Sequence, residues 1–126
     1  MHKGIVYAAV LVSDQDKALD FYTNVVGLTK RADNPANGGP RFVAVGVEDQ
    51  EDFVLLLWPG TPGEGEPANG RIPASYTIET EDIHEAVEVL KSRGVEFDTE
   101  VLEFPFAYLA GFQDPDGNRL QLREGR

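Results

Sequence analysis

The chain has 126 residues, the length of one ordinary domain, and 41% of them are hydrophobic, a composition typical of globular rather than disordered proteins. Its 22 acidic and 11 basic residues give a formal charge of −11, which argues against nucleic acid or an anionic membrane surface as a partner. Cysteine is absent, which excludes disulfides, thiolate catalysis and cysteine-ligated metal sites.

The first half of the chain predicts one strand, one helix and three further strands. Residues 5–12 are apolar and β-branched, which favours a strand. Ser13 is the expected N-cap of a helix with one apolar stripe, and Gly27 stands where a left-handed C-terminal cap falls. Further strands are expected at residues 28–32, 41–47 and 53–58, and the Asn34 to Pro40 stretch has the composition of a loop.

The second half repeats this pattern after a segment rich in glycine and proline. Residues 59–71 show no periodicity and are expected to form an exposed linker. A strand is then expected at residues 74–79, followed by a helix with Thr80 as its N-cap and Gly94 at its end. The remaining strands are predicted at residues 95–97, 108–113 and 119–122, with a tight turn at residues 114–118 between the last two.

The two halves align with each other. Ala18 matches Ala86 and Gly27 matches Gly94, offsets of 68 and 67 residues. Each half therefore predicts a βαβββ unit, which is too small to bury both faces of its sheet. The helix covers one face, and the other face needs a partner from the second half or from another chain.

These motifs resemble the vicinal oxygen chelate superfamily, which contains glyoxalase I, bleomycin-resistance proteins and extradiol dioxygenases. Residues 12–22 with Gly27 and Leu28 resemble the signature of its first module, and residues 93–95 with 114–118 resemble that of its second. The resemblance implies an α+β fold in which two βαβββ modules form a curled, cup-shaped mixed sheet with the helices outside. It also implies one domain over residues 1–126, with module one at about 4–58, a linker at about 59–72 and module two at about 73–124.

Enzymes of this superfamily hold a divalent metal through one residue from the first and last strand of each module. The matching positions here are Tyr7, Leu56, Ser75 and Gln121. Leucine cannot ligate a metal, the two hydroxyls stay protonated at neutral pH, and an amide is a weak donor. We therefore expect no metal and no cofactor, and the sequence names no catalytic residue.

The cup itself is expected to bind a small molecule. Strand alternation places Tyr7, Leu56 and Trp58 on an apolar wall, while Phe106 is a candidate for the lip. The opposite wall is polar and comprises Ser75, Thr77, Glu79 and Gln121. An apolar surface with a few polar groups is typical of ligand pockets, which indicates sequestration of a hydrophobic or aromatic molecule in the manner of bleomycin-resistance proteins. Glu79 is also a candidate partner for a cationic group.

Several alternatives remain open from the sequence. Tyr7 and Trp58 are as well suited to a core or dimer-interface role as to ligand binding, and Phe106 is suited to packing beneath the sheet. The functional alternative is an enzyme: a metal-dependent lyase or dioxygenase with shifted ligands, or a metal-free enzyme that uses Glu79 or Tyr7 as acid or base. The resemblance implies a homodimer. No apolar run approaches the roughly 20 residues of a membrane helix, and no signal peptide is recognised, so a cytoplasmic location is expected.

Overall fold

The computed structural model describes residues 1–35, 41–60 and 75–126. Most of the predicted loop at Asn34 to Pro40 and most of the predicted linker lie outside the described residues.

The first half of the chain forms a four-stranded sheet with the order β1-β4-β3-β2. Strand β1 is parallel to β4, while β3 is antiparallel to both β4 and β2. The predicted first helix is divided into an α-helical part and a π-helical part. The elements are β1 (Tyr7–Val12), α1 (Gln15–Asp20), the π-helix η1 (Phe21–Val25), β2 (Thr29–Asn34), β3 (Phe42–Gly46) and β4 (Val54–Pro59).

The second half forms a separate four-stranded sheet with the equivalent order β5-β8-β7-β6. Strand β5 is parallel to β8, as β1 is to β4. The elements are β5 (Ser75–Glu79), α2 (Ile83–Ser92), β6 (Leu102–Glu103), β7 (Ala107–Gln113) and β8 (Arg119–Gly125). The predicted α+β fold with two βαβββ units is therefore confirmed, and we refer to these units as module one and module two.

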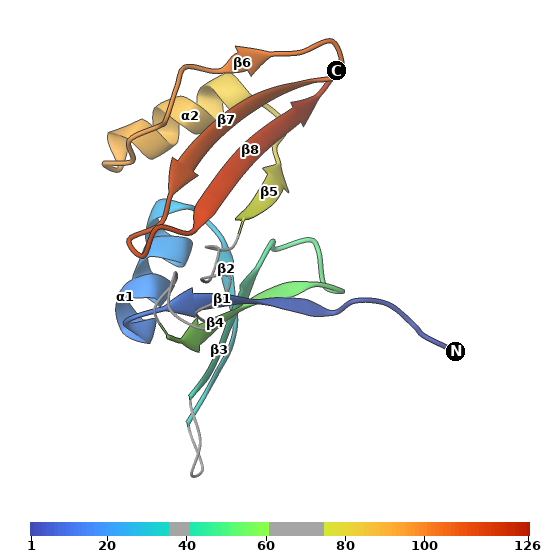
Figure 1. The fold of residues 1–126 in the computed structure, drawn as a ribbon, viewed down its shortest axis with the longest axis vertical. Coiled ribbons are helices and arrows are strands. Elements are labelled where there is room, and N and C mark those ends of the chain that lie inside the picture. Colours follow the sequence, from blue (N-terminus) through green and yellow to red (C-terminus); the bar gives the residue numbers. More distant parts are fainter. Residues whose placement is uncertain (36–40, 61–74) are drawn as a thin grey trace, which may run out of the picture.

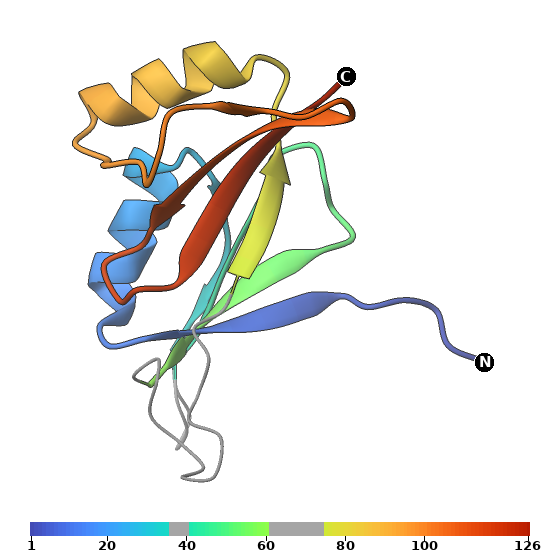
Figure 2. The same ribbon diagram turned by 45° about the horizontal axis from the view of Figure 1, so that its top comes forward.

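Both sheets turn one face toward a shared hydrophobic core. The core side of module one includes Val10 and Leu57, and that of module two includes Phe112 and Leu120; all four are essentially buried and belong to one cluster. Figures 1 and 2 show the two helices on the same side of the molecule, with the N-terminal segment extending away from the sheets. The opposite face of each sheet is left without a helix over it (Figure 1).

A buried polar network ties the modules together. The hydroxyl of Tyr22 in η1 donates a hydrogen bond of 2.7 Å to Asp114 Oδ2 at the end of β7. Asn118 Nδ2 donates to the same carboxylate oxygen and to the carbonyl of Leu11, at 2.9 Å in both cases. The turn predicted at residues 114–118 thus closes module two and also fastens it to module one.

The helix N-caps differ from the prediction. Asp14, not Ser13, accepts a hydrogen bond from the backbone N–H of Lys17, and Asp82, not Thr80, accepts one from the N–H of Glu85. Asp14 follows Ser13 directly, and Asp82 comes two residues after Thr80. A carboxylate is a strong acceptor that also complements the positive end of the helix.

The other end of both helices agrees with the prediction. Gly27 and Gly94 have φ angles of +94° and +92°, the left-handed conformation expected of a glycine after a helix.

The segment after α2 is less regular than predicted. Residues 95–97 do not form a strand but touch the sheet at one bridge between Phe97 and Phe112. The ring of Phe97 packs 5.2 Å from that of Phe112, which fixes the segment through a side chain rather than a ladder of backbone bonds. The edge strand of this sheet is instead β6, which the sequence did not predict.

Candidate functional site

The sheet of module one presents an apolar face on the side away from the core. Residues paired across neighbouring strands share a face, and the register pairs Ala9 with Leu56 and Leu11 with Trp58. Tyr7 lies on the same face by alternation and is 50% exposed. We call this surface the cup face of module one; it comprises Tyr7, Ala9, Leu11, Val54, Leu56 and Trp58. The predicted grouping of Tyr7, Leu56 and Trp58 agrees with this register.

Module two presents a polar face in the equivalent position. The register pairs Ser75 with Arg119, Thr77 with Gln121, and Glu79 with Arg123. We call these six residues the cup face of module two. The Thr77 hydroxyl donates a hydrogen bond of 3.3 Å to Gln121 Oε1, which leaves the amide group of Gln121 free to donate. The predicted polar set is therefore placed on one surface.

Glu79 is held in an ion pair and is not a free carboxylate. Arg123 Nη1 donates to its Oε1 at 2.6 Å, and the backbone N–H of Gly125 donates to its Oε2 at 3.0 Å. The Arg123 guanidinium, with the Gly125 N–H, holds the pKa of Glu79 below its ordinary value. Glu79 therefore carries a charge that is already balanced at neutral pH, which suits neither a general base nor a partner for a cationic ligand.

The second arginine of this face is also neutralised, because Arg119 Nη2 donates to Asp98 Oδ2. Gly111 in the neighbouring strand β7 pairs with Gln121 and has no side chain of its own. The ion pair lies over this glycine, because a Cβ there would be 3.3 Å from Asp98 Oδ2 and 3.6 Å from Arg119 Nη2.

Phe106 is exposed, so the alternative that it packs beneath the sheet is wrong. Its side chain is 60% exposed and stacks on Phe104, with ring centroids 5.7 Å apart and an interplanar angle of 22°. The two rings lie between β6 and β7 at the edge of the sheet, which is compatible with the expected lip.

The contacts between the modules lie on the core side of the sheets. A cavity of about 210 Å³ lies between Val45, Phe53, Val54 and Leu55 of module one and residues 76–79 of module two. Val54, Thr77 and Glu79, which belong to the cup faces, therefore also border this cavity. Among the residues described, no hydrogen bond, ion pair or ring contact joins Tyr7, Leu56 or Trp58 to the polar set of module two. The two cup faces are thus both present but are not closed on each other by such contacts.

The residues at the metal-binding positions do not fit a divalent cation. Tyr7, Leu56, Ser75 and Gln121 offer a phenol, an alkyl chain, an alcohol and an amide, and Gln121 already shares its oxygen with Thr77. In the described part of the chain, no three histidine, aspartate or glutamate side chains gather in a way that could hold a metal. None of the helices described there has the length and apolar character needed to span a membrane.

A model of the Glyoxalase/Bleomycin resistance protein/Dioxygenase superfamily matches residues 4–122. The uncharacterised protein YetH of Bacillus subtilis is 34% identical over 98% of the chain and 100% of YetH. The chain is also 27% identical to the lactoylglutathione lyase of Neisseria meningitidis, over 94% of the chain and 88% of the lyase.

Among solved structures, the chain is similar to TnmS3, an antibiotic binding protein from Streptomyces sp. CB03234. The TM-score is 0.82 and the identity 31%, over 100% of this chain and 99% of TnmS3.

Proposed function

Because the chain belongs to the Glyoxalase/Bleomycin resistance protein/Dioxygenase superfamily, we propose that it is a metal-free binding protein that sequesters a small hydrophobic or aromatic molecule. The observation that carries this proposal is that module one has an apolar aromatic face and module two has a polar face whose charges are balanced internally. Apolar area with a few orienting hydrogen-bonding groups is what ligand pockets use. The similarity to an antibiotic binding protein supports the same class of function.

We propose that the ligand lies against Tyr7, Leu56 and Trp58 on one side. Hydrogen bonds come from the other side of the cup, which is formed by Ser75, Thr77, Glu79 and Gln121. Phe106 contributes to the lip. Since Glu79 and Arg123 neutralise each other, the ligand that suits this surface is neutral rather than cationic. This changes the role of Glu79 from counter-charge to a fixed part of the polar wall.

We further propose that a second copy of the chain completes each cup. Tyr7 is half exposed, and the side chains of Ser75, Thr77 and Glu79 are exposed, although all belong to sheet faces. The modules already pack together through their core sides, so another chain can cover both cup faces. Sedimentation at micromolar concentration is expected to give a dimer, and a monomer alone would contradict this arrangement.

We propose that residues 1–126 act as one domain of two modules and that the protein works in the cytoplasm. The equivalent strand orders of the two sheets and their common core support the single-domain assignment.

Binding is tested with 1-naphthol, a neutral two-ring aromatic, by following the fluorescence of Trp58, the single tryptophan. We expect saturable quenching, weakened roughly tenfold in Tyr7→Ala because an aromatic wall is lost. Val89→Ala, on the exposed side of α2, is the matched control and should bind as the parent does. If Tyr7→Ala left the affinity for 1-naphthol unchanged, the proposal that the ligand binds in the cup would be wrong.

The second candidate is a superfamily enzyme, favoured by the similarity to lactoylglutathione lyase. The enzyme would be a glyoxalase-type lyase or an extradiol-type dioxygenase whose metal ligands lie at other positions than those compared above. Otherwise it would be a metal-free enzyme that uses Glu79 or Tyr7 as acid or base. The lowered pKa of Glu79 argues against that residue as a base at neutral pH. Turnover of the hemithioacetal of methylglyoxal and glutathione by the purified protein would favour the enzyme.

A further inference from the structure

The acceptor atoms on the cup face of module two are mostly engaged within the face itself. Gln121 Oε1 accepts a hydrogen bond from the Thr77 hydroxyl. The two carboxylate oxygens of Glu79 accept from Arg123 and from the backbone N–H of Gly125. A ligand on this face therefore meets few oxygen atoms that lack a donor.

The groups left over on the same face are N–H donors. An arginine side chain has five N–H donors and no acceptor. In the described part of the chain, Arg119 donates only through Nη2, to Asp98. Arg123 donates only through Nη1, to Glu79. The side chains of Arg119 and Arg123 are 51% and 39% exposed, so their remaining N–H groups can reach a molecule on the surface.

Gln121 adds a donor in the middle of the face. It pairs with Thr77 in the register of β5 and β8, and the Thr77 hydroxyl holds its amide oxygen. Within residues 1–35, 41–60 and 75–126, no acceptor is found for the amide nitrogen Nε2, which carries two N–H donors. Since the oxygen is already held, the amide is oriented before a ligand arrives, which reduces the ordering cost of binding.

We propose that the ligand of the cup is an aromatic molecule with an acceptor oxygen, an aryl ketone or a related carbonyl compound, and that Gln121 Nε2 donates to this oxygen. This ligand class rests on the proposed function, since it concerns the same cup. A face whose charges are balanced and whose free groups are N–H donors favours a neutral acceptor over a molecule that offers only donors.

The test compares 1-acetylnaphthalene, an aryl ketone, with 2-(1-naphthyl)propene, in which a CH₂ group replaces the carbonyl oxygen. Protein-observed NMR titration of the full chain measures the affinity for each probe. Gln121→Glu keeps an oxygen for Thr77 but replaces the NH₂ donor with a second oxygen, which repels a carbonyl. We expect this variant to weaken the ketone roughly tenfold and to change the affinity for the alkene by less than about twofold.

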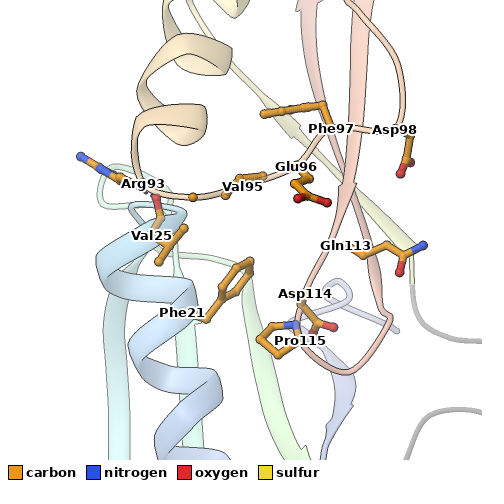
Figure 3. Close-up of a pocket in the computed structure, with 11 residues that line it drawn as sticks. Phe21, Val25, Arg93, Val95, Glu96, Phe97, Asp98, Gln113, Asp114 and Pro115 are labelled. Carbon is orange, nitrogen blue, oxygen red and sulfur yellow. Dashed lines mark hydrogen bonds between the residues drawn. The ribbon is translucent and has the colours of Figure 1, made fainter.

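Two controls show whether the effect belongs to the cup. Gln50→Glu adds the same charge in the exposed segment between β3 and β4 and should leave both affinities unchanged. Signals of Phe21 and Phe97, which line a separate cleft of about 560 Å³ beside η1 (Figure 3), should not shift with either probe. Unchanged amide signals in the core of Gln121→Glu would show that the variant is folded.

The assignment of the ligand class is overturned, while the cup stands, if Gln121→Glu weakens both probes equally or leaves the ketone unaffected. Tyr7→Ala should weaken both probes alike, because it removes part of the aromatic wall that they share. If neither probe binds the parent protein, or if both shift only the cleft beside η1, the proposed function fails together with the ligand class.

Discussion

Asp114 illustrates how one residue serves both the fold and the surface. Its carboxylate accepts hydrogen bonds from Tyr22 of module one and from Asn118 of its own turn, while the residue also lines a cleft between η1 and the segment after α2. Because the group is almost fully buried, each donor that it loses leaves a poorly solvated charge.

Tyr22→Phe is therefore expected to destabilise the protein by about 1–3 kcal/mol, because a buried acceptor loses its hydroxyl partner. Urea unfolding followed by circular dichroism measures this loss. Tyr108→Phe is the control, since no hydrogen bond of the Tyr108 hydroxyl is found in the described structure. Equal stability of the two variants would show that the Tyr22 hydroxyl contributes nothing to joining the modules.

Tyr22 and Tyr76 also predict a loss of stability at high pH. Burial raises the pKa of both phenols above the ordinary value of 10.0, so above about pH 10 the unfolded chain releases protons that the folded chain keeps. The unfolded state then binds fewer protons, and the free energy of unfolding falls with pH by up to about 1.4 kcal/mol per pH unit for each tyrosine. Urea unfolding at pH 9, 10 and 11 should show a shallower decline for Tyr76→Phe; a parallel decline would contradict the assignment.

At the level of single residues, the sequence shows which side chains share a face of the sheet. It does not show whether a charged side chain on that face is free or already ion-paired. The period of two in a strand is enough to group Ser75, Thr77 and Glu79. Whether Glu79 is free depends on Arg123, 44 residues away in the chain, and on the backbone N–H of Gly125. Such long-range partners leave no local pattern, and the same holds for the contacts of Phe97 with Phe112 and of Asp114 with Tyr22.

The start of a helix is hard to predict where two neighbouring residues are both good N-caps. Ser13 and Asp14 are both good N-cap residues, and the structure uses Asp14, whose φ of −141° and ψ of 109° are the extended values of a capping residue. Sequence patterns predict where the helix lies but not which of these two residues is its N-cap, because serine and aspartate have nearly equal preference for that position.

Asp14→Ala and Asp82→Ala are each expected to cost about 0.5–2 kcal/mol of stability through loss of the cap. Ser13→Ala is the matched control and should cost less, because in the described structure Ser13 forms its hydrogen bond, to Asp116 Oδ1, through the backbone N–H, which alanine keeps. Thermal or urea unfolding distinguishes them. If Ser13→Ala were the more damaging change, the assignment of Asp14 as cap would be wrong.

Helices and strands are predictable from the sequence where apolar residues recur with a helical or strand period over several residues. The apolar stripes of α1 and α2 and the left-handed Gly27 and Gly94 all appear as expected. Strand β6 was missed because two residues carry no period, and residues 95–97 were assigned to a strand although Phe97 makes only one bridge.

At the scale of the whole molecule, the internal repeat explains both the common core and the unoccupied faces. Two equivalent modules bury their core sides against each other, which leaves the apolar cup face of one and the polar cup face of the other available for a ligand and a second chain. The repeat was visible in the sequence. The way the modules pack was not, because it depends on contacts such as Tyr22 with Asp114, which are 92 positions apart.

The proposal of a metal-free cup depends on the donor set at Tyr7, Leu56, Ser75 and Gln121. Its most direct test is elemental analysis of the protein purified without added metal and without chelator. We expect far less than one equivalent of any transition metal per chain. Zinc, iron, manganese or nickel at one equivalent per chain, lost together with 1-naphthol binding on dialysis against EDTA, would contradict it.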